Sequence, residues 1–179
     1  PSLVYAVKFA PDGSSVSLAV GVWNNAKIHV EILEHRPMSA GTQWLVMFFM
    51  ENKRWYKANK IIIDGAAGTQ LLVEELVRTE KKMSKRILTP NVKEAGAAYA
   101  AFHNAIEQGL LTHFNQPALN NSVRTVKKRS IGKDGMFGYA SMNADIQSDP
   151  TEAAAFAYYG SIRFKKEKTT SGSSQSIMV

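Results

Sequence analysis

Cysteine does not occur among the 179 residues of the chain, which excludes a disulfide scaffold and a thiolate metal site. This composition is compatible with a reducing cytoplasm. The histidines do not follow the spacing of metal ligands, and neither a Ser-His-Asp arrangement nor a dinucleotide-binding loop is visible. Chemistry must therefore be sought in other residue types, and carboxylates are the first to consider.

Long apolar runs are missing as well. The longest, residues 44–50 ("WLVMFFM"), is far below the roughly 20 residues that a membrane-spanning helix needs. The N-terminal segment has no charged region followed by an apolar one, so we expect neither a targeting signal nor a membrane partner. A strand pattern begins within a few residues of Pro1, which suggests a domain of a longer chain.

The charge is one-sided, with a formal net charge of +7 and a sequence pI near 9.6. Such a charge favours a polyanionic partner such as nucleic acid, or it serves solubility. Hydrophobic residues make up 45% of the chain, enough for one domain with a substantial core. We expect this domain to span residues 1–163. Residues 164–179, which are Lys-rich and then Ser-rich, are expected to form a flexible tail.

Hydrophobic periodicity predicts a mixed α/β fold. Three early strands are joined by short turns, which favours an antiparallel meander, and two later strands are each reached through a helix. The expected strands are residues 3–10, 16–23, 27–36, 60–64 and 84–90. The expected helices are residues 39–59, 69–82, 92–109, 116–126 and 149–162, with a basic hairpin or loop at 127–141.

This order predicts a mixed five-stranded sheet, three strands antiparallel and two parallel, with helices on both faces. The arrangement corresponds to the ribonuclease H-like fold. Within it, we expect Leu71, Leu72 and Leu76 to face the core from the helix 69–82. Asp149 is expected to cap the last helix, with Pro150 at its first position.

Asp64 ends the apolar segment "KIIID" and is followed by the small residues "GAAG". In open α/β sheets functional groups gather beyond the carboxyl ends of the strands, so Asp64 is a candidate site residue. The small residues behind it would let a ligand approach closely. The alternative is that Asp64 starts the turn or caps the following helix.

Further carboxylates precede and begin the last helix in "NADIQSDPTEAAA". Asp145 and Asp149 are both candidate partners of Asp64, and the local spacing does not decide between them. Glu152 stands three residues after Asp149, where a capping-box role is the favoured interpretation. Hard cations such as Mg²⁺ or Mn²⁺ take carboxylate ligands, and a pair of such ions can promote phosphodiester cleavage.

Several stretches resemble the C-terminal nuclease domain of the large terminase subunit of tailed bacteriophages. They extend from about Val4 to Gly160: "YAVKFAPDGSSVSLAV", "IHVEILEHR", "IIIDGAAGTQLLVEEL", "AGAAYAAFHNAIEQGLLTHFNQPALNNSVRTVKKR" and "ADIQSDPTEAAAFAYYG". The resemblance implies a ribonuclease H-like, metal-dependent endonuclease that cuts concatemeric double-stranded DNA during head packaging in the bacterial host cytoplasm. It also implies an ATPase motor domain, a small terminase subunit and a portal as partners. No Gly-x-x-x-x-Gly-Lys-Ser/Thr loop occurs here, so this chain carries no motor.

Residue by residue, Asp64 matches the family's aspartate at the end of the fourth strand, and Asp145 or Asp149 falls near the aspartate before the last helix. The resemblance therefore gives Asp64, Asp145 and Asp149 as catalytic residues that bind two Mg²⁺ or Mn²⁺ ions. Where the family has its first aspartate, this chain has Lys8. Either Asp12 substitutes as a ligand, or Lys8 replaces one cation and leaves a one-metal site, or the site is impaired. For Asp12, a simple turn role is favoured.

The segment around residues 124–139 is basic and carries only one acidic residue, Asp134. In the family this region forms a hairpin beside the active site, which implies contacts to the DNA backbone. The expected nucleic-acid-binding residues are Lys127, Lys128, Arg129 and Lys133.

Two other functions stay open. One is a nucleic-acid-binding module that keeps the fold but has lost cleavage with the first aspartate. The other is a different ribonuclease H-like nuclease, such as a resolvase or an enzyme that cuts RNA–DNA hybrids.

Overall fold

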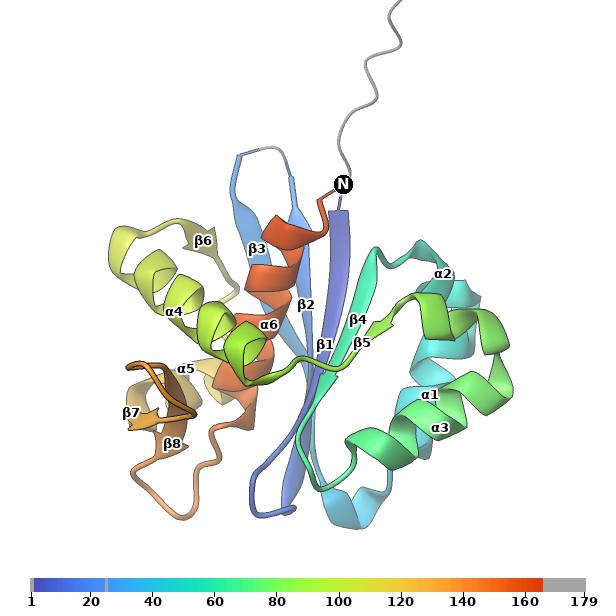
Figure 1. Ribbon diagram of the computed structural model, residues 1–179, viewed down its shortest axis with the longest axis horizontal. Coiled ribbons are helices and arrows are strands. Elements are labelled where there is room, and N and C mark those ends of the chain that lie inside the picture. The colour runs from blue at the N-terminus through green and yellow to red at the C-terminus, as the bar shows by residue number, and fades with distance from the viewer. Residues whose placement is uncertain (1, 25, 166–179) are drawn as a thin grey trace, which may run out of the picture.

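The computed structural model describes residues 2–24 and 26–165 (Figure 1). The tail expected at 164–179 lies, apart from its first two residues, outside the described residues. The strands are β1 (Ser2–Phe9), β2 (Ser15–Trp23), β3 (Ile28–Pro37), β4 (Lys60–Asp64), β5 (Ile87–Leu88), β6 (Leu111–Thr112), β7 (Val126–Ser130) and β8 (Phe137–Ser141). The helices are α1 (Gln43–Met50), α2 (Arg54–Lys57), α3 (Thr69–Thr79), α4 (Val92–Gln108), α5 (Pro117–Thr125) and α6 (Asp149–Arg163), with 3₁₀ turns η1 (Met38–Ala40), η2 (Glu51–Lys53) and η3 (Lys81–Lys85).

The main sheet has six strands in the order β5-β4-β1-β2-β3-β6. Strands β1, β2 and β3 form the expected antiparallel meander, and β4 lies parallel to β1. β5 is parallel to β4, and β6 is parallel to β3. The ribonuclease H-like arrangement is confirmed. The predicted five strands were one too few, because the two-residue strand β6 is too short to give a periodic pattern.

Helices cover both faces of this sheet (Figure 1). On one face α6 packs directly on β1, β2 and β3, and α4 packs on α6. On the other face lie α1, α2 and α3, whose apolar residues join Phe9, Leu18 and Ile63 in a second core. Because side chains alternate along a strand, Val4 and Ala6 of β1 face α6 and their neighbours face α1 and α3.

Two helix predictions need correction. The helix expected at 39–59 is interrupted, because Asn52 and Lys53 have positive φ angles of 51° and 53° and separate α1 from α2. On α3, Leu72 and Leu76 are fully buried as expected, but Leu71 is 65% exposed. Leu72 and Leu76 are four residues apart and define the buried stripe, so the residue before Leu72 turns toward solvent.

The start of α6 also differs from the prediction. Asp149 is the first helical residue rather than the cap, and Ser148 occupies the N-cap position without a side-chain capping bond. Nearly all of α6 is buried between the sheet and α4, and small residues such as Ala153, Ala154 and Ala157 allow this close packing. The first turn of α6 thereby brings Asp149 and Glu152 against the sheet.

Candidate functional site

Four polar side chains form a row across the neighbouring strands β4, β1, β2 and β3. Asp64 of β4 is in register with Lys8 of β1, Lys8 with Ser17 of β2, and Ser17 with His35 of β3. Residues in register on neighbouring strands point to the same face. The row therefore faces the first turn of α6, at the carboxyl ends of the parallel pair β1 and β4.

Lys8 lies between two carboxylates. Its Nζ is 2.5 Å from Oδ2 of Asp64 and 2.9 Å from Oε2 of Glu152. Lys8 is only 6% exposed and Glu152 is fully buried, whereas the side chain of Asp64 is 26% exposed. An ammonium group this deeply buried requires compensating charge, which the two carboxylates provide.

The protonation of Lys8 follows from this setting. Burial lowers the pKa of Lys8, but the charges of Glu152 and Asp64 outweigh it, and the net pKa is raised above its usual value. Lys8 is therefore an ammonium at neutral pH. Tyr99 of α4 has a pKa raised well above its usual value, first by burial and then by the charge of Glu152, so its hydroxyl stays protonated and donates to Glu152 Oε2 over 2.9 Å.

Glu152 is a residue of this site, not a capping-box residue as the sequence favoured. Its Oε1 accepts a 2.8 Å hydrogen bond from the Ser148 hydroxyl, and its Oε2 is bound by Tyr99 and Lys8. Two signals in the sequence pointed to this role. Lys8 is a single charge in an otherwise apolar strand and needs an acidic partner, and Glu152 lies one helical turn from Asp149 on the same face.

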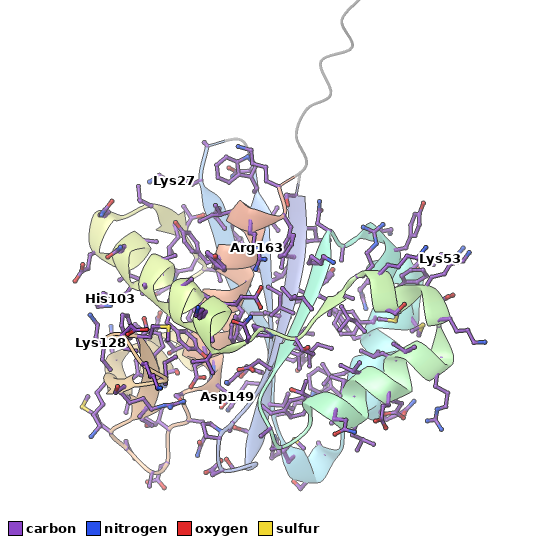
Figure 2. The ribbon with its side chains drawn as sticks, viewed as in Figure 1. Lys27, Lys53, His103, Lys128, Asp149 and Arg163 are labelled. Atoms are coloured by element: carbon purple, nitrogen blue, oxygen red, sulfur yellow. The ribbon has the colours of Figure 1, made fainter. Side chains whose placement is uncertain are left out.

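Asp149 lies beside the other end of the polar row. It is fully buried at the start of α6 (Figure 2). It accepts hydrogen bonds from the hydroxyl groups of Ser15 at 2.9 Å and Ser17 at 2.6 Å. His35 Nδ1 lies 3.2 Å from Asp149 Oδ2. The hydrogen bond with Asp149 raises the pKa of His35, against the lowering effect of burial. Ser17 and His35 were not predicted as site residues.

The remaining acidic candidates lie apart from the row. Asp145 is exposed in the loop between β8 and α6, where its backbone N–H donates to the Asn143 side chain. Asp12 is an exposed turn residue whose Oδ1 accepts from the backbone N–H and the hydroxyl of Ser14, and these bonds lower its pKa. The structure thus brings Asp149 against the sheet but leaves Asp145 in solvent, and Asp12 keeps the turn role favoured from the sequence.

A cavity of about 420 Å³ opens beside the paired charges. Lys8 and Asp64 line it together with Asn91, Tyr99 and Arg129. The Nε of Arg129 donates to the Tyr139 carbonyl over 2.9 Å, which anchors the guanidinium group at the cavity. The cavity therefore presents one carboxylate and two cationic side chains to a ligand.

The basic segment forms the expected hairpin, with β7 and β8 antiparallel. Lys127, Lys128, Arg129 and Lys133 are all exposed, but of these only Arg129 lines the cavity. Lys128 Nζ lies 4.5 Å from the centre of the Phe137 ring. The hairpin therefore carries exposed positive charge next to the acidic site.

The expected pair of Mg²⁺ or Mn²⁺ ions does not fit this donor set. Both oxygens of Glu152 and both oxygens of Asp149 already accept hydrogen bonds, and Oδ2 of Asp64 is bound to Lys8. Residues 2–24 and 26–165 contain no group of three or more His, Asp or Glu side chains that could hold a metal ion. Asp64 is partly exposed and uses only Oδ2 for Lys8, so Oδ1 is the carboxylate oxygen that can take a single ion together with a phosphate.

No protein-family model matches the sequence, and no curated protein matches it. The structure, by contrast, has clear neighbours. The large terminase nuclease from the thermophilic phage G20c aligns with 88% of this chain and 82% of its own, with a TM-score of 0.65 and 13% identity. The same nuclease with bound magnesium has a TM-score of 0.50 over the same shares.

A second neighbour is a longer protein, the large terminase from another thermophilic bacteriophage. It aligns with 91% of this chain at a TM-score of 0.56 and 11% identity, and the match spans 39% of its own length. This chain therefore corresponds to about two fifths of that protein. The helices among the described residues include none that is long and apolar enough to cross a membrane. The likeness expected from the sequence is confirmed, and the chain has the fold of the phage large terminase nucleases.

Proposed function

We propose that this chain is the DNA-cleaving domain of a large terminase subunit, an endonuclease that cuts concatemeric double-stranded DNA during phage genome packaging. The observation that carries the proposal is the placement of Asp64 at the carboxyl end of β4, where Lys8 joins it to the buried Glu152 and a cavity is lined by Arg129, within the fold of the phage large terminase nucleases. Cationic groups in the cavity attract a phosphodiester, and a carboxylate beside them can hold a divalent ion.

The residues have separate tasks in this proposal. Lys127, Lys128, Arg129 and Lys133 bind the DNA backbone, and Arg129 directs a phosphate toward Asp64. Asp64 would hold a divalent ion, Mg²⁺ or Mn²⁺, which when bound supplies charge neutralisation and a more acidic water. Asp149 holds Ser17 and His35 in place beside Lys8. The magnesium bound in the G20c nuclease supports a divalent ion in this fold.

The partners follow from the same proposal. An ATPase motor domain belongs to the same large subunit, a small terminase subunit and a portal complete the packaging machine, and the host cytoplasm is its place of action. The match to only 39% of the longer large terminase supports a further domain outside this chain.

A second candidate is a double-stranded DNA-binding domain that does not cleave. Lys8 favours it, because its ion pairs with Asp64 and Glu152 occupy the oxygens that a pair of catalytic ions would need. In this case the hairpin and Arg129 would still bind the backbone.

Supercoiled plasmid incubated with the chain and Mg²⁺ or Mn²⁺ separates the two candidates. We expect nicking that disappears in Asp64→Ala and persists in Glu74→Ala, a matched control on α3 whose carboxylate bonds to Gln70. Plasmid binding without nicking would support the non-cleaving domain. The absence of both binding and nicking would contradict both candidates. Preferential cutting of an RNA–DNA hybrid would instead indicate a different ribonuclease H-like nuclease.

A further inference from the structure

The ammonium group of Lys8 is the cation that lies between the two carboxylates of the site. It contacts one carboxylate from β4 and one from α6, and it lies at the carboxyl ends of the parallel strands β1 and β4. The two carboxylates are held from other directions as well, because Tyr99 and Ser148 bind Glu152 and the strand fixes Asp64. Lys8 is thus enclosed by a built arrangement of anionic oxygens.

The formal charges around the cavity balance. Lys8 and Arg129 supply two positive charges. Asp64, which lines the cavity, and Glu152, which does not line it but contacts Lys8, supply two negative charges. With a neutral residue in place of Lys8 these groups would carry a net charge of −1, and with an acidic residue −2, so a phosphodiester would be repelled unless a divalent ion entered. With Lys8 present, no additional cation is required for a phosphate to approach.

Lys8 also has capacity for a ligand. An ammonium group carries three N–H donors, and within the described residues two of them are used by Asp64 and Glu152. Lys8 lines the cavity, as does the guanidinium group of Arg129. A phosphodiester oxygen in the cavity can therefore meet donors from both side chains.

We infer that Lys8 is the resident cation of this cavity: it replaces a divalent ion in neutralising Asp64 and Glu152, so the cavity binds a phosphodiester of duplex DNA without metal. The inference deepens the proposed function, on which the choice of DNA as phosphate source rests. It separates phosphate binding, which Lys8 and Arg129 support without a metal ion, from cleavage, which would need the single ion at Asp64.

The first test measures Mn²⁺ binding to the 179-residue chain in the absence of DNA, from the electron paramagnetic resonance signal of free Mn²⁺. We expect weak binding by the unmodified chain and at least roughly tenfold tighter binding by Lys8→Asp, which would place three carboxylates together. Lys8→Met, which removes the charge and the N–H donors but introduces no carboxylate, should also bind Mn²⁺ more tightly and carries the test if Lys8→Asp does not fold. Equal affinity in the unmodified chain and the folded variants would overturn the inference.

The second test measures the affinity for a short duplex of about two helical turns by fluorescence anisotropy, in EDTA and in Mg²⁺ at equal ionic strength. The unmodified chain should bind equally within about twofold, whereas Lys8→Asp should bind roughly fivefold or more weakly in EDTA and recover in Mg²⁺. Lys53→Asp makes the same charge change on the opposite side of the molecule from Lys128 and the hairpin (Figure 2), and it should show no such metal dependence.

The outcomes distinguish this inference from the proposed function. A requirement for Mg²⁺ in the unmodified chain would overturn the role of Lys8 even if the domain cleaves DNA. Failure of the unmodified chain and of every variant to bind DNA, together with the expected Mn²⁺ affinities, would instead overturn the proposed function and its choice of DNA as the phosphate source. Lys8 would then remain the cation that neutralises Asp64 and Glu152.

Discussion

Asp149 and Glu152 stand one helical turn apart at the start of α6, yet they bind opposite parts of the polar row. Asp149 is hydrogen-bonded to Ser17 and close to His35, while Glu152 is bound to Lys8. Both carboxylates are fully buried. The first turn of α6 is therefore attached to β1, β2 and β3 by charged contacts as well as by apolar packing.

Loss of the Glu152 charge should destabilise the chain strongly. In Glu152→Gln the buried ammonium of Lys8 loses one of its two counter-charges, and we expect a loss of about 3 kcal/mol in the free energy of unfolding. Asp64→Asn should cost only about 1 kcal/mol, because Asp64 is partly exposed and water can replace its interaction with Lys8. Urea unfolding of both variants measures the difference. Equal losses would show that burial does not determine the strength of these pairs.

His35 should make stability depend on pH. Because the folded pKa of His35 is raised above the unfolded value of about 6.5, its charged interaction with Asp149 stabilises the fold fully below that value and disappears as the pH rises through the folded pKa. The difference in unfolding free energy between the unmodified chain and His35→Gln should therefore be greatest below about pH 6.5 and shrink as the pH rises above it. His113→Gln, at an exposed position, serves as the control. A difference that stays constant with pH would contradict the prediction.

The hairpin should determine how DNA affinity responds to salt. Replacing Lys127, Lys128 and Lys133 with Gln removes exposed positive charges, and the slope of log K against log salt should fall by about 0.9 for each phosphate that is no longer neutralised. Lys53→Gln in η2 should leave the slope unchanged, since Lys53 lies far from the hairpin (Figure 2). Binding titrations at several salt concentrations test this. An unchanged slope in the triple variant would place the DNA on another surface.

Gly21 of β2 should be essential for the position of α6. A Cβ at Gly21 would lie 2.3 Å from the Ala157 carbonyl oxygen and 2.4 Å from Ser161 Oγ, so the helix would have to move. We expect Gly21→Ala to lower the unfolding free energy by about 2 kcal/mol, as is typical of overpacked cores. Gly160→Ala should cost less, because a Cβ there meets the side chains of Val4 and Ile62 rather than backbone. Thermal unfolding of the two variants compares these costs, and a larger loss for Gly160→Ala would contradict the prediction.

Much of the fold could be predicted from the sequence because its signals are local. Alternating apolar residues and short turns predict β1, β2 and β3, and the apolar run before Asp64 predicts β4. The break between α1 and α2 could not be predicted in the same way. Residues 51–57 look helical by composition, and only the backbone conformation of Asn52 and Lys53 ends the helix.

The site was predictable only in part, for the same reason. Asp64 could be placed because a strand end is a local feature, whereas the choice between Asp145 and Asp149 depends on a loop whose path the sequence does not specify. The sequence by itself predicted the antiparallel meander and the two strands reached through helices, the acidic candidates, the basic hairpin and the presence of Lys8 where a carboxylate is expected. That Lys8 is enclosed by Asp64 and Glu152, and that Asp149 is joined to Ser17 and His35, follows only from the docking of α6 on the sheet. Contacts between residues more than 130 positions apart are fixed by packing and strand register, which no local pattern encodes.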